Sequence, residues 1–441
     1  MHGYKYLVMG EEREHCKIEA PDYTTKVELT ADVVTVERVW CCKERLLHPS
    51  VDTNGSLKDV CLSFALFKLL RRRYFGYPAV EAQQPKTKEL VFGGLLSVKS
   101  ERTAKAEVDK ERVFRVIKME IGFLRDYFFT RNNFSHAANQ LASSEAGLPK
   151  THLWLLYYKV LAIFCKPKFS LSVKSTLGQY SLVRNCNKSS LSRSSISRLF
   201  ISATSCKEAP PPGLKKSKEV ILSEHVKNAI FYNLARSRGE LTNGTATLQR
   251  YEHHDLMWTL NLAAPVHTIM VWHIATSFCE IHPVKEAANK ESIEPNLTVA
   301  THLSNYCAYL VAFRPDLLPL TSCYSVKYVF RKVFEETCEF FGREKKLEGK
   351  YQMMSCGDGG LQIIHQGSAL GRYLSENIND DNERWKIIAE FWSELILFIA
   401  PSGSTRQHIE RLGNGSEFIT HLWALLYHGG IVDTSSAEYH L

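Results

Sequence analysis

The sequence predicts a mostly α-helical protein. A bundle-like helical C-terminal region is preceded by a smaller N-terminal region of helices with some strand, and a flexible linker joins them. Apolar residues recur every three or four positions over long segments, most clearly in residues 108–129 and 380–428. Side chains suited to helix N-caps precede several of these segments, and glycine or proline follows them. The looser apolar alternation that is typical of strands is found in residues 23–40.

The composition is that of a globular chain with more than one domain. The chain has 441 residues, of which 44% are hydrophobic and 23% charged, so it can bury a sizeable core and is not wholly disordered. The formal net charge is +8. This mild basic bias is compatible with nucleic acid or with an anionic membrane surface, and by itself it selects neither.

The cysteines and the apolar segments bear on the cellular compartment of the chain and on whether it spans a membrane. The 12 cysteines are scattered without C-x-x-C spacing, which favours reduced thiols in a reducing compartment. Residues 1–15 are polar and predict no secretory signal. The longest apolar segments, Leu153–Cys165 and Val266–Cys279, are shorter than the roughly 20 residues that span a bilayer. We interpret both as buried or interfacial helices, and the first as a candidate half of a broken span.

The N-terminal region begins with short strands and a helix. The loose alternation of 23–40 ends at Trp40, and its β-branched residues predict one or two short strands. Residues 57–73 predict a helix that runs into three arginines, Arg71 to Arg73, which suit the negative C-terminal pole of a helix. We interpret these arginines as solvated, with contacts to lipid headgroups or RNA as the alternative.

A stronger amphipathic helix follows at residues 108–129. Its apolar face keeps the spacing of three and four residues throughout, with Glu120 as the polar exception.

Three segments divide the chain. We expect an N-terminal region at 1–165, a basic linker rich in serine and proline at 166–219, and a helical C-terminal region at 220–441. The linker ends in Pro210–Gly213. It is interpreted as mobile and solvated, with phosphorylation or weak RNA binding as alternatives.

Several helices are predicted in the C-terminal region. Ser223 is a suitable N-cap for a helix through Arg236, and further helices are expected at 265–280, 297–314 and 324–341.

The segment after residue 380 has the clearest pattern. Asp380 or Asp381 can cap a helix through Ile399, and Pro401 ends it. Ser404 can cap a short helix through Leu412, stopped by Gly413, and Ser416 can cap a last helix at Glu417–His428.

These residues resemble a known family. The segments Arg384–Glu394, Ile399–Ser402 and His408–Leu426 are similar to the C-terminal signature of the plant domain of unknown function 594, at about residues 380–436. Segments upstream resemble domain of unknown function 4220, which precedes it in the same proteins. They are Leu57–Arg73, Phe114–Glu120 and Gly178–Leu182. Two further segments, Val271–Thr276 and Leu303–Leu310, are also similar to the family.

The resemblance implies a membrane protein of several N-terminal membrane helices, a loop, further membrane helices and a helical cytoplasmic region. This chain departs from that plan, because it starts after the expected first group, and its second group is reduced to Leu153–Cys165 and the serine-rich stretch. We therefore expect a truncated member, a soluble paralogue or an incomplete gene product that is membrane-associated or cytoplasmic. The family supplies no catalytic residues to carry over.

Chemical motifs give little. His421 and His428 are two turns apart on one helix, too far for two ligands of one ion, and neither a nucleophile elbow nor a phosphate loop occurs in the sequence. Gly413 to Ser416 is interpreted as a turn between helices rather than an anion site. We therefore predict no catalytic, cofactor-binding or metal-binding residue.

The hypothesis is a non-enzymatic helical interaction or scaffold protein. We expect an unknown protein partner, a membrane surface as a second candidate partner, and no specific nucleic acid. The alternatives are an unrecognised enzyme with a site near Glu394, His408, Glu417 and His421, and a weak RNA binder through the linker. The motif residues without assigned chemistry are Trp385, Trp392, Glu394, His408, Gly413, Gly415, Glu417, His421 and Trp423. The three tryptophans of this set, Trp385, Trp392 and Trp423, are expected to lie in one compact C-terminal core.

Overall fold

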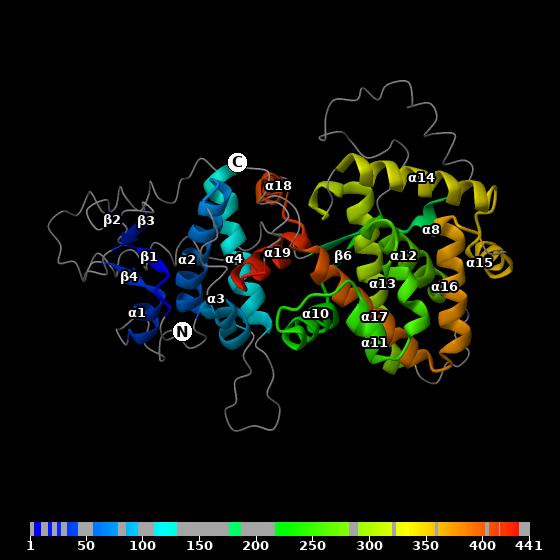
Figure 1. Cartoon of the computed structure of the whole chain (residues 1–441), viewed down its shortest axis with the longest axis horizontal. Helices are drawn as coiled ribbons and strands as arrows, with labels where there is room; N and C mark the ends of the chain where they lie inside the picture. The colour runs from blue at the N-terminus through cyan, green and yellow to red at the C-terminus, as the bar shows by residue number, and fades with distance from the viewer. Residues whose placement is uncertain are drawn as a thin grey trace, which may run out of the picture. The chain divides into compact units, whose positions relative to one another are not determined.

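The computed structural model describes two compact units (Figure 1). Unit 1 comprises Met1–Lys174 with Thr405–Val432, and unit 2 comprises Ser175–Ser404 with Asp433–Leu441. The described residues are 4–9, 16–19, 24–27, 33–42, 56–77, 85–95, 110–129, 176–186, 217–281, 290–319, 323–357, 360–401, 405–413 and 415–431. Most of them are helical, which confirms the predicted fold class.

Short antiparallel strand pairs and a helix open unit 1. Strand β1 (Leu7–Met9) pairs with β4 (Val34–Thr35), and β2 (Cys16–Glu19) pairs with β3 (Thr24–Val27). The one or two short strands predicted within 23–40 are confirmed as β3 and β4, and the end of that segment, with Trp40, lies in helix α1 (Val36–Cys41). The Thr35 hydroxyl accepts the Arg38 N–H at 3.3 Å, and this N-cap starts the helix at the end of the alternating segment.

A pair of parallel helices forms the body of unit 1. Helix α2 (Ser56–Tyr74) packs along α4 (Lys110–Phe129), with α3 (Pro85–Glu89) and the π-helical turn η3 (Leu90–Leu95) between them in the chain. The Asp59 carboxylate near the start of α2 binds Arg112 at 2.8 Å and Arg115 at 2.6 Å near the start of α4. Both helices have the extents predicted from their apolar faces to within a few residues.

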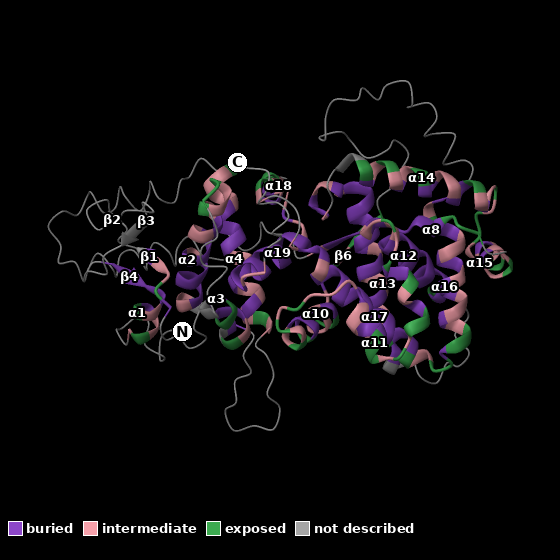
Figure 2. Cartoon of the chain, viewed as in Figure 1, coloured by how far each residue is buried: buried purple, intermediate pink, exposed green. Residues whose placement is uncertain are grey.

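The last helices of unit 1 come from the other end of the sequence. Helix α18 (Thr405–Leu412) packs on α2 and α4, and α19 (Phe418–His428) packs on α4 and η3. Every residue of α19 is buried, as its purple ribbon shows (Figure 2). The residue at its N-cap is Glu417, which gives no side-chain cap bond, rather than the expected Ser416. Ser416 is buried instead, and its hydroxyl has no hydrogen-bond partner.

Unit 2 is a helical assembly with one strand pair. Its elements are β5 (Thr176–Gln179), α8 (Leu182–Asn185), β6 (Ser217–Ile221), α10 (Glu224–Ser237), α11 (Thr245–Arg250), η5 (His254–Leu260), α12 (Pro265–Ile281), α13 (Lys290–Phe313), η7 (Pro315–Leu317), α14 (Cys323–Phe341), α15 (Leu347–Cys356), α16 (Ile363–Asn377) and α17 (Asp381–Ile399). Its core is built mainly where α12 packs on α16 and α13 packs on α17.

Glycines allow the closest of these packings. A Cβ added at Gly367 of α16 would lie 2.6 Å from Ile274 of α12, and one at Gly371 would lie 2.7 Å from Phe278. Such distances are shorter than any real carbon contact. The two glycines therefore let the backbone of α16 approach the side chains of α12 directly.

The predicted helices of unit 2 are largely confirmed, with one boundary changed. Ser223 caps α10 by accepting the Val226 N–H at 3.3 Å, and Asp380 caps α17 by accepting the Asn382 N–H at 3.0 Å. Helix α13 begins at Lys290 rather than at 297 and includes Pro295. Pro295 is the sixth residue of the helix and has no N–H to donate to the carbonyl four residues before it, so α13 continues there with one backbone hydrogen bond fewer.

Two predicted segments differ from the structure or lie outside it. Residues 176–186 and 217–219 of the predicted linker are structured, because β5 pairs antiparallel with β6 and α8 follows β5. Residues 166–175 and 187–216 of the linker and the segment Leu153–Cys165 lie outside the described residues. Among the helices that the structure describes, none combines the length and the hydropathy needed to cross a bilayer.

Candidate functional site

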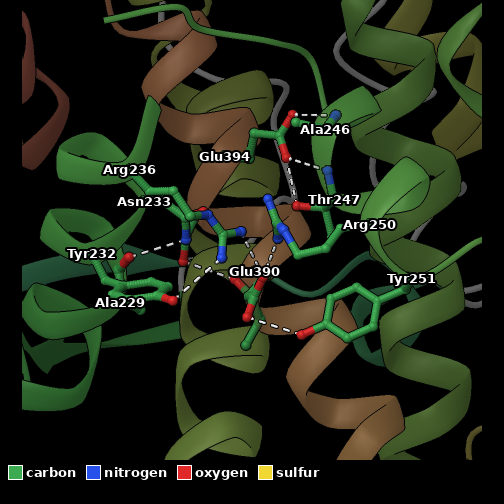
Figure 3. A network of polar contacts seen from close by, with 12 residues as sticks. Ala229, Tyr232, Asn233, Arg236, Ala246, Thr247, Arg250, Tyr251, Glu390 and Glu394 are labelled. Carbon is green, nitrogen blue, oxygen red and sulfur yellow. Dashed lines mark hydrogen bonds and ion pairs between the residues drawn. The ribbon is translucent and has the colours of Figure 1, made fainter. Parts of the chain in front are cut away.

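Two carboxylates on one face of α17 organise a polar network of unit 2, which Figure 3 shows. Glu390 and Glu394 are one helical turn apart, so their side chains leave the helix in the same direction. The helix that carries them is fixed by its Asp380 cap and by an apolar face whose residues are nearly all buried.

Glu394 is buried and accepts hydrogen bonds from a single loop and helix start. Its Oε1 accepts the Gly244 N–H at 3.0 Å and the Ala246 N–H at 3.1 Å, and its Oε2 accepts the Thr247 N–H at 2.8 Å. The hydroxyls of Thr242 and Thr247 donate to the same carboxylate. Glu394 therefore caps α11 from outside, and its negative charge suits the positive pole of that helix.

Gly244 makes this approach sterically feasible. It is the N-cap residue of α11 and offers no side chain for the purpose, with φ at 109° in the left-handed region. A Cβ at this position would lie 2.3 Å from the ring of Phe391, which itself stacks on Trp272 at 3.5 Å between ring centroids. The capping role that the glycine cannot fill is taken by a side chain from another helix.

Glu390 joins three segments at a more exposed position. It accepts from Arg236 at 3.1 Å, from Arg250, and from the Tyr251 hydroxyl at 3.0 Å (Figure 3). The pKa of Tyr251 is raised, mainly by burial and secondly by the Glu390 carboxylate, so its phenol keeps its proton and donates the hydrogen bond. These bonds tie α10 and the end of α11 to α17.

This geometry fixes helices rather than preparing a reaction. Two carboxylate oxygens offer about four lone-pair sites, and five donor groups already surround those of Glu394. A general acid or base has to exchange a proton with a substrate group within hydrogen-bond reach. Backbone N–H groups and threonine hydroxyls already take up the Glu394 oxygens, where a substrate group would have to bind.

The tryptophans of α17 and a buried histidine extend the same pattern. Trp385 and Trp392 are buried, and the Trp392 indole N–H donates to Thr276 at 3.0 Å. His273 Nε2 accepts the Leu182 N–H at 3.0 Å, and its Nδ1 lies 2.9 Å from the Ser304 hydroxyl. Burial lowers the pKa of His273 to about 4, so the ring is a neutral joint between segments.

The remaining predicted motif residues lie in unit 1. His408 stacks on Trp423, with 4.6 Å between ring centroids, and its Nδ1 lies 3.1 Å from the Thr420 hydroxyl. His421 Nδ1 donates to the Glu417 carbonyl oxygen at 3.2 Å, and burial lowers the pKa of this histidine to about 4.

Two glycines shape the turn between α18 and α19. A Cβ at Gly413 would lie 3.0 Å from the ring of Phe129, so the glycine lets that ring approach the backbone. Gly415 has φ at 97°, a conformation that other residues rarely adopt.

The motif residues therefore belong to two separate units. Glu394, Trp385 and Trp392 are in unit 2, whereas His408, Glu417, His421, Trp423 and both glycines are in unit 1. The expectation that the three tryptophans share one core is wrong, since Trp423 belongs to the other unit. Within the described part of the chain, no three histidine, cysteine or acidic side chains are grouped to hold a metal ion.

Three buried ionisable groups were given no role by the sequence analysis. Glu120 of α4 and His428 of α19 are both buried, with 2.6 Å between Oε1 and Nε2, and burial raises the pKa of Glu120. Lys350 is fully buried and donates to the carbonyl oxygens of Val183 at 2.6 Å and Cys186 at 2.7 Å. For Glu120 a signal existed, because it was the polar exception on an apolar helix face.

Comparisons with known proteins give two matches. Residues 1–186 match the family described as "Domain of unknown function (DUF4220)", and residues 377–431 match the one described as "Protein of unknown function, DUF594". The second match begins just before α17 in unit 2 and ends just after α19 in unit 1. The search of curated proteins and the search of solved structures give no match.

Proposed function

Because the chain carries a domain of unknown function 4220 followed by a domain of unknown function 594, as the resemblance predicted, we propose that it works as a non-enzymatic helical interaction or scaffold protein. The observation that supports this most is the use made of Glu394. Glu394 was a carboxylate of the candidate enzyme site, and it caps the neighbouring helix α11 instead.

Other polar motif residues support the same proposal. His408 is stacked and hydrogen-bonded, His421 is bonded to the carbonyl one turn before it, and His273 joins two segments. Buried polar groups that are hydrogen-bonded within the protein in this way specify one arrangement of helices. A defined helical surface is what a protein needs in order to bind another.

The experiment compares Glu394→Gln with Glu383→Gln, an exposed position on the same helix. We expect Glu394→Gln to lower the free energy of unfolding by about 1–3 kcal/mol, because an amide places donors against donors. Glu383→Gln should change it little. Native purification and cross-linking identify the partner that the wild type binds at fixed stoichiometry. The Glu394 variant should bind the same partner at temperatures below its melting temperature.

Two outcomes would overturn the proposal. One is a wild-type chain that stays monomeric, with no partner cross-linked at fixed stoichiometry. The other is a Glu394 variant that melts like wild type but no longer supports the function of the chain in its cells, as expected of a catalytic group.

The location that fits this proposal is the surface of a membrane facing a reducing compartment. The test separates membranes from the soluble fraction and washes them with carbonate. Release by carbonate indicates a peripheral protein, as proposed. Resistance to the wash would mean that some segment is inserted, and a chain found only in the soluble fraction would contradict the membrane location.

A further inference from the structure

The C-terminal ends of α2 and α4 lie together at one end of unit 1. The helices are parallel and side by side (Figure 1), with the Asp59 ion pairs near their starts. Near their ends, the rings of Tyr74 and Phe128 are 4.4 Å apart between centroids. Whatever follows the last turn of either helix is therefore presented on the same end of the unit.

Large apolar side chains are exposed at this end. Phe75 is 56% exposed, Tyr77 is 57% exposed and Phe129 is 47% exposed. Such residues scattered singly over a surface need no explanation, but three at one end of a helix pair form a patch of the kind that marks an interaction site.

Three consecutive arginines border the rings. Arg71, Arg72 and Arg73 occupy the last turn of α2, and the segment 71–77 contains no acidic residue. The Arg71 guanidinium lies 5.3 Å from the centre of the Tyr127 ring, so it is held against α4. We call the six residues Arg71, Arg72, Arg73, Phe75, Tyr77 and Phe129 the aromatic–arginine end.

The backbone holds this surface in a fixed shape. The Gly76 N–H donates to the Arg73 carbonyl at 3.1 Å and the Tyr77 N–H donates to the Arg72 carbonyl at 3.2 Å. With Gly76 at φ 83°, this is a Schellman turn, which folds the chain back over the end of the helix. The ring of Phe129 is held differently, against the backbone at Gly413.

We propose that the aromatic–arginine end docks on the surface of an anionic lipid bilayer. The three exposed rings enter the headgroup region, where aromatic side chains are favoured, and the arginines contact lipid phosphates and carboxylates. The inference deepens the proposed function and rests on it, because it names the surface that would hold the scaffold at a membrane.

Charge and shape together favour a bilayer over an acidic protein. Exposed rings that directly follow three arginines in the chain suit a partner that accepts apolar atoms and positive charge side by side, and an anionic bilayer surface offers both over its whole area. The rings stand at the end of a helix pair, where they can meet a surface without entering a groove.

The experiment sediments the purified full chain with vesicles of phosphatidylcholine containing phosphatidylserine, and with vesicles of phosphatidylcholine alone. We expect binding to the anionic vesicles, weakened at high salt. An arginine near such a surface contributes roughly fivefold to the partition coefficient, so replacing Arg71, Arg72 and Arg73 by Gln should lower it about a hundredfold.

A second variant guards against a folding defect in the first. Phe75→Ser with Tyr77→Ser removes two exposed rings without touching the core, and it should also weaken binding while the melting temperature stays unchanged. The matched control is Tyr328→Ser with Lys332→Gln, an exposed aromatic and a cation one turn apart on α14 of unit 2. This control should bind like wild type.

Three results would overturn the inference. They are no binding to anionic vesicles, binding that the Phe75 and Tyr77 double variant leaves unchanged, and retention of an acidic polypeptide or RNA by this end in place of vesicles. None of them touches the scaffold proposal, which depends on the cross-linked partner. Conversely, a chain without a protein partner could still bind vesicles through this end.

Discussion

The two units bury a carboxylate in opposite ways. In unit 2, Glu394 meets five donors that come from one loop and one helix start. In unit 1, Glu120 has a single partner, His428, and its second oxygen has no hydrogen-bond partner. Hydrogen bonds from converging backbone N–H groups thus offset the burial of the Glu394 carboxylate, whereas burial between apolar helix faces, only partly offset by His428, raises the pKa of Glu120.

The largest expected effect separates the two units. Trp392→Ala should destabilise unit 2 and Trp423→Ala should destabilise unit 1, each by about 3–5 kcal/mol, because each removes a buried indole. Hydrogen exchange followed by mass spectrometry would locate the loss of protection. Loss of protection in both units for either variant would contradict the division into two cores.

The comparison of the carboxylates is sharpened by replacing each with its amide. Glu394→Gln should lower the free energy of unfolding by about 1–3 kcal/mol, whereas Glu120→Gln should lower it less, because burial already raises the pKa of Glu120 and its hydrogen-bond partner is His428 rather than five donors. Denaturant melts of both variants provide the measurement. Equal losses would contradict this difference between the two sites.

Acid should lower the stability of unit 2 through His273. The pKa of His273 is lowered to about 4 in unit 2, so its contribution is present above the ordinary histidine pKa and is lost as pH falls toward 4. From pH 7 to pH 5 this amounts to about 2 kcal/mol. Melts across this range would test it, with His273→Gln as the variant that should flatten the dependence.

The raised pKa of Glu120 works in the other direction in unit 1. Its contribution is complete below the ordinary carboxyl pKa and is lost as pH rises through the folded-state value. The stability of Glu120→Gln relative to wild type should therefore increase with pH. A constant difference between the two proteins from pH 4 to pH 8 would contradict this assignment.

The smallest effect concerns helix caps in each unit. Ser223→Ala in unit 2 and Thr35→Ala in unit 1 each remove a side chain that accepts a backbone N–H at 3.3 Å. Each should lower the free energy of unfolding by about 1 kcal/mol. Replacement by Asn, which can also cap, should recover most of the loss, and failure to recover it would mean that the hydroxyls act in another way.

Local patterns predicted the helices well. The apolar spacing of α2 and α4, and the caps at Ser223 and Asp380, depend on residues a few positions apart, which a sequence shows directly. The cap at Ser416 failed because Glu417 takes that position, and the alternation of 23–40 did not reveal that Thr35 starts a helix at its end.

The candidate site was harder to predict than the helices. An apolar face tells which side of a helix is buried but not against what. The partners of Glu120 and Glu394 are 308 and about 150 positions away, so their roles depended on packing that no local pattern encodes. For the same reason the sequence did not indicate that α18 and α19 leave the unit of α17.

The burial of α19 within unit 1 has a consequence for biosynthesis. Roughly 230 residues separate Lys174 from Thr405, so the N-terminal helices leave the ribosome on the order of tens of seconds before the helix that covers them. Until then the apolar faces that will contact α19 are bare. Unit 1 therefore completes its folding only after most of unit 2 has been synthesised.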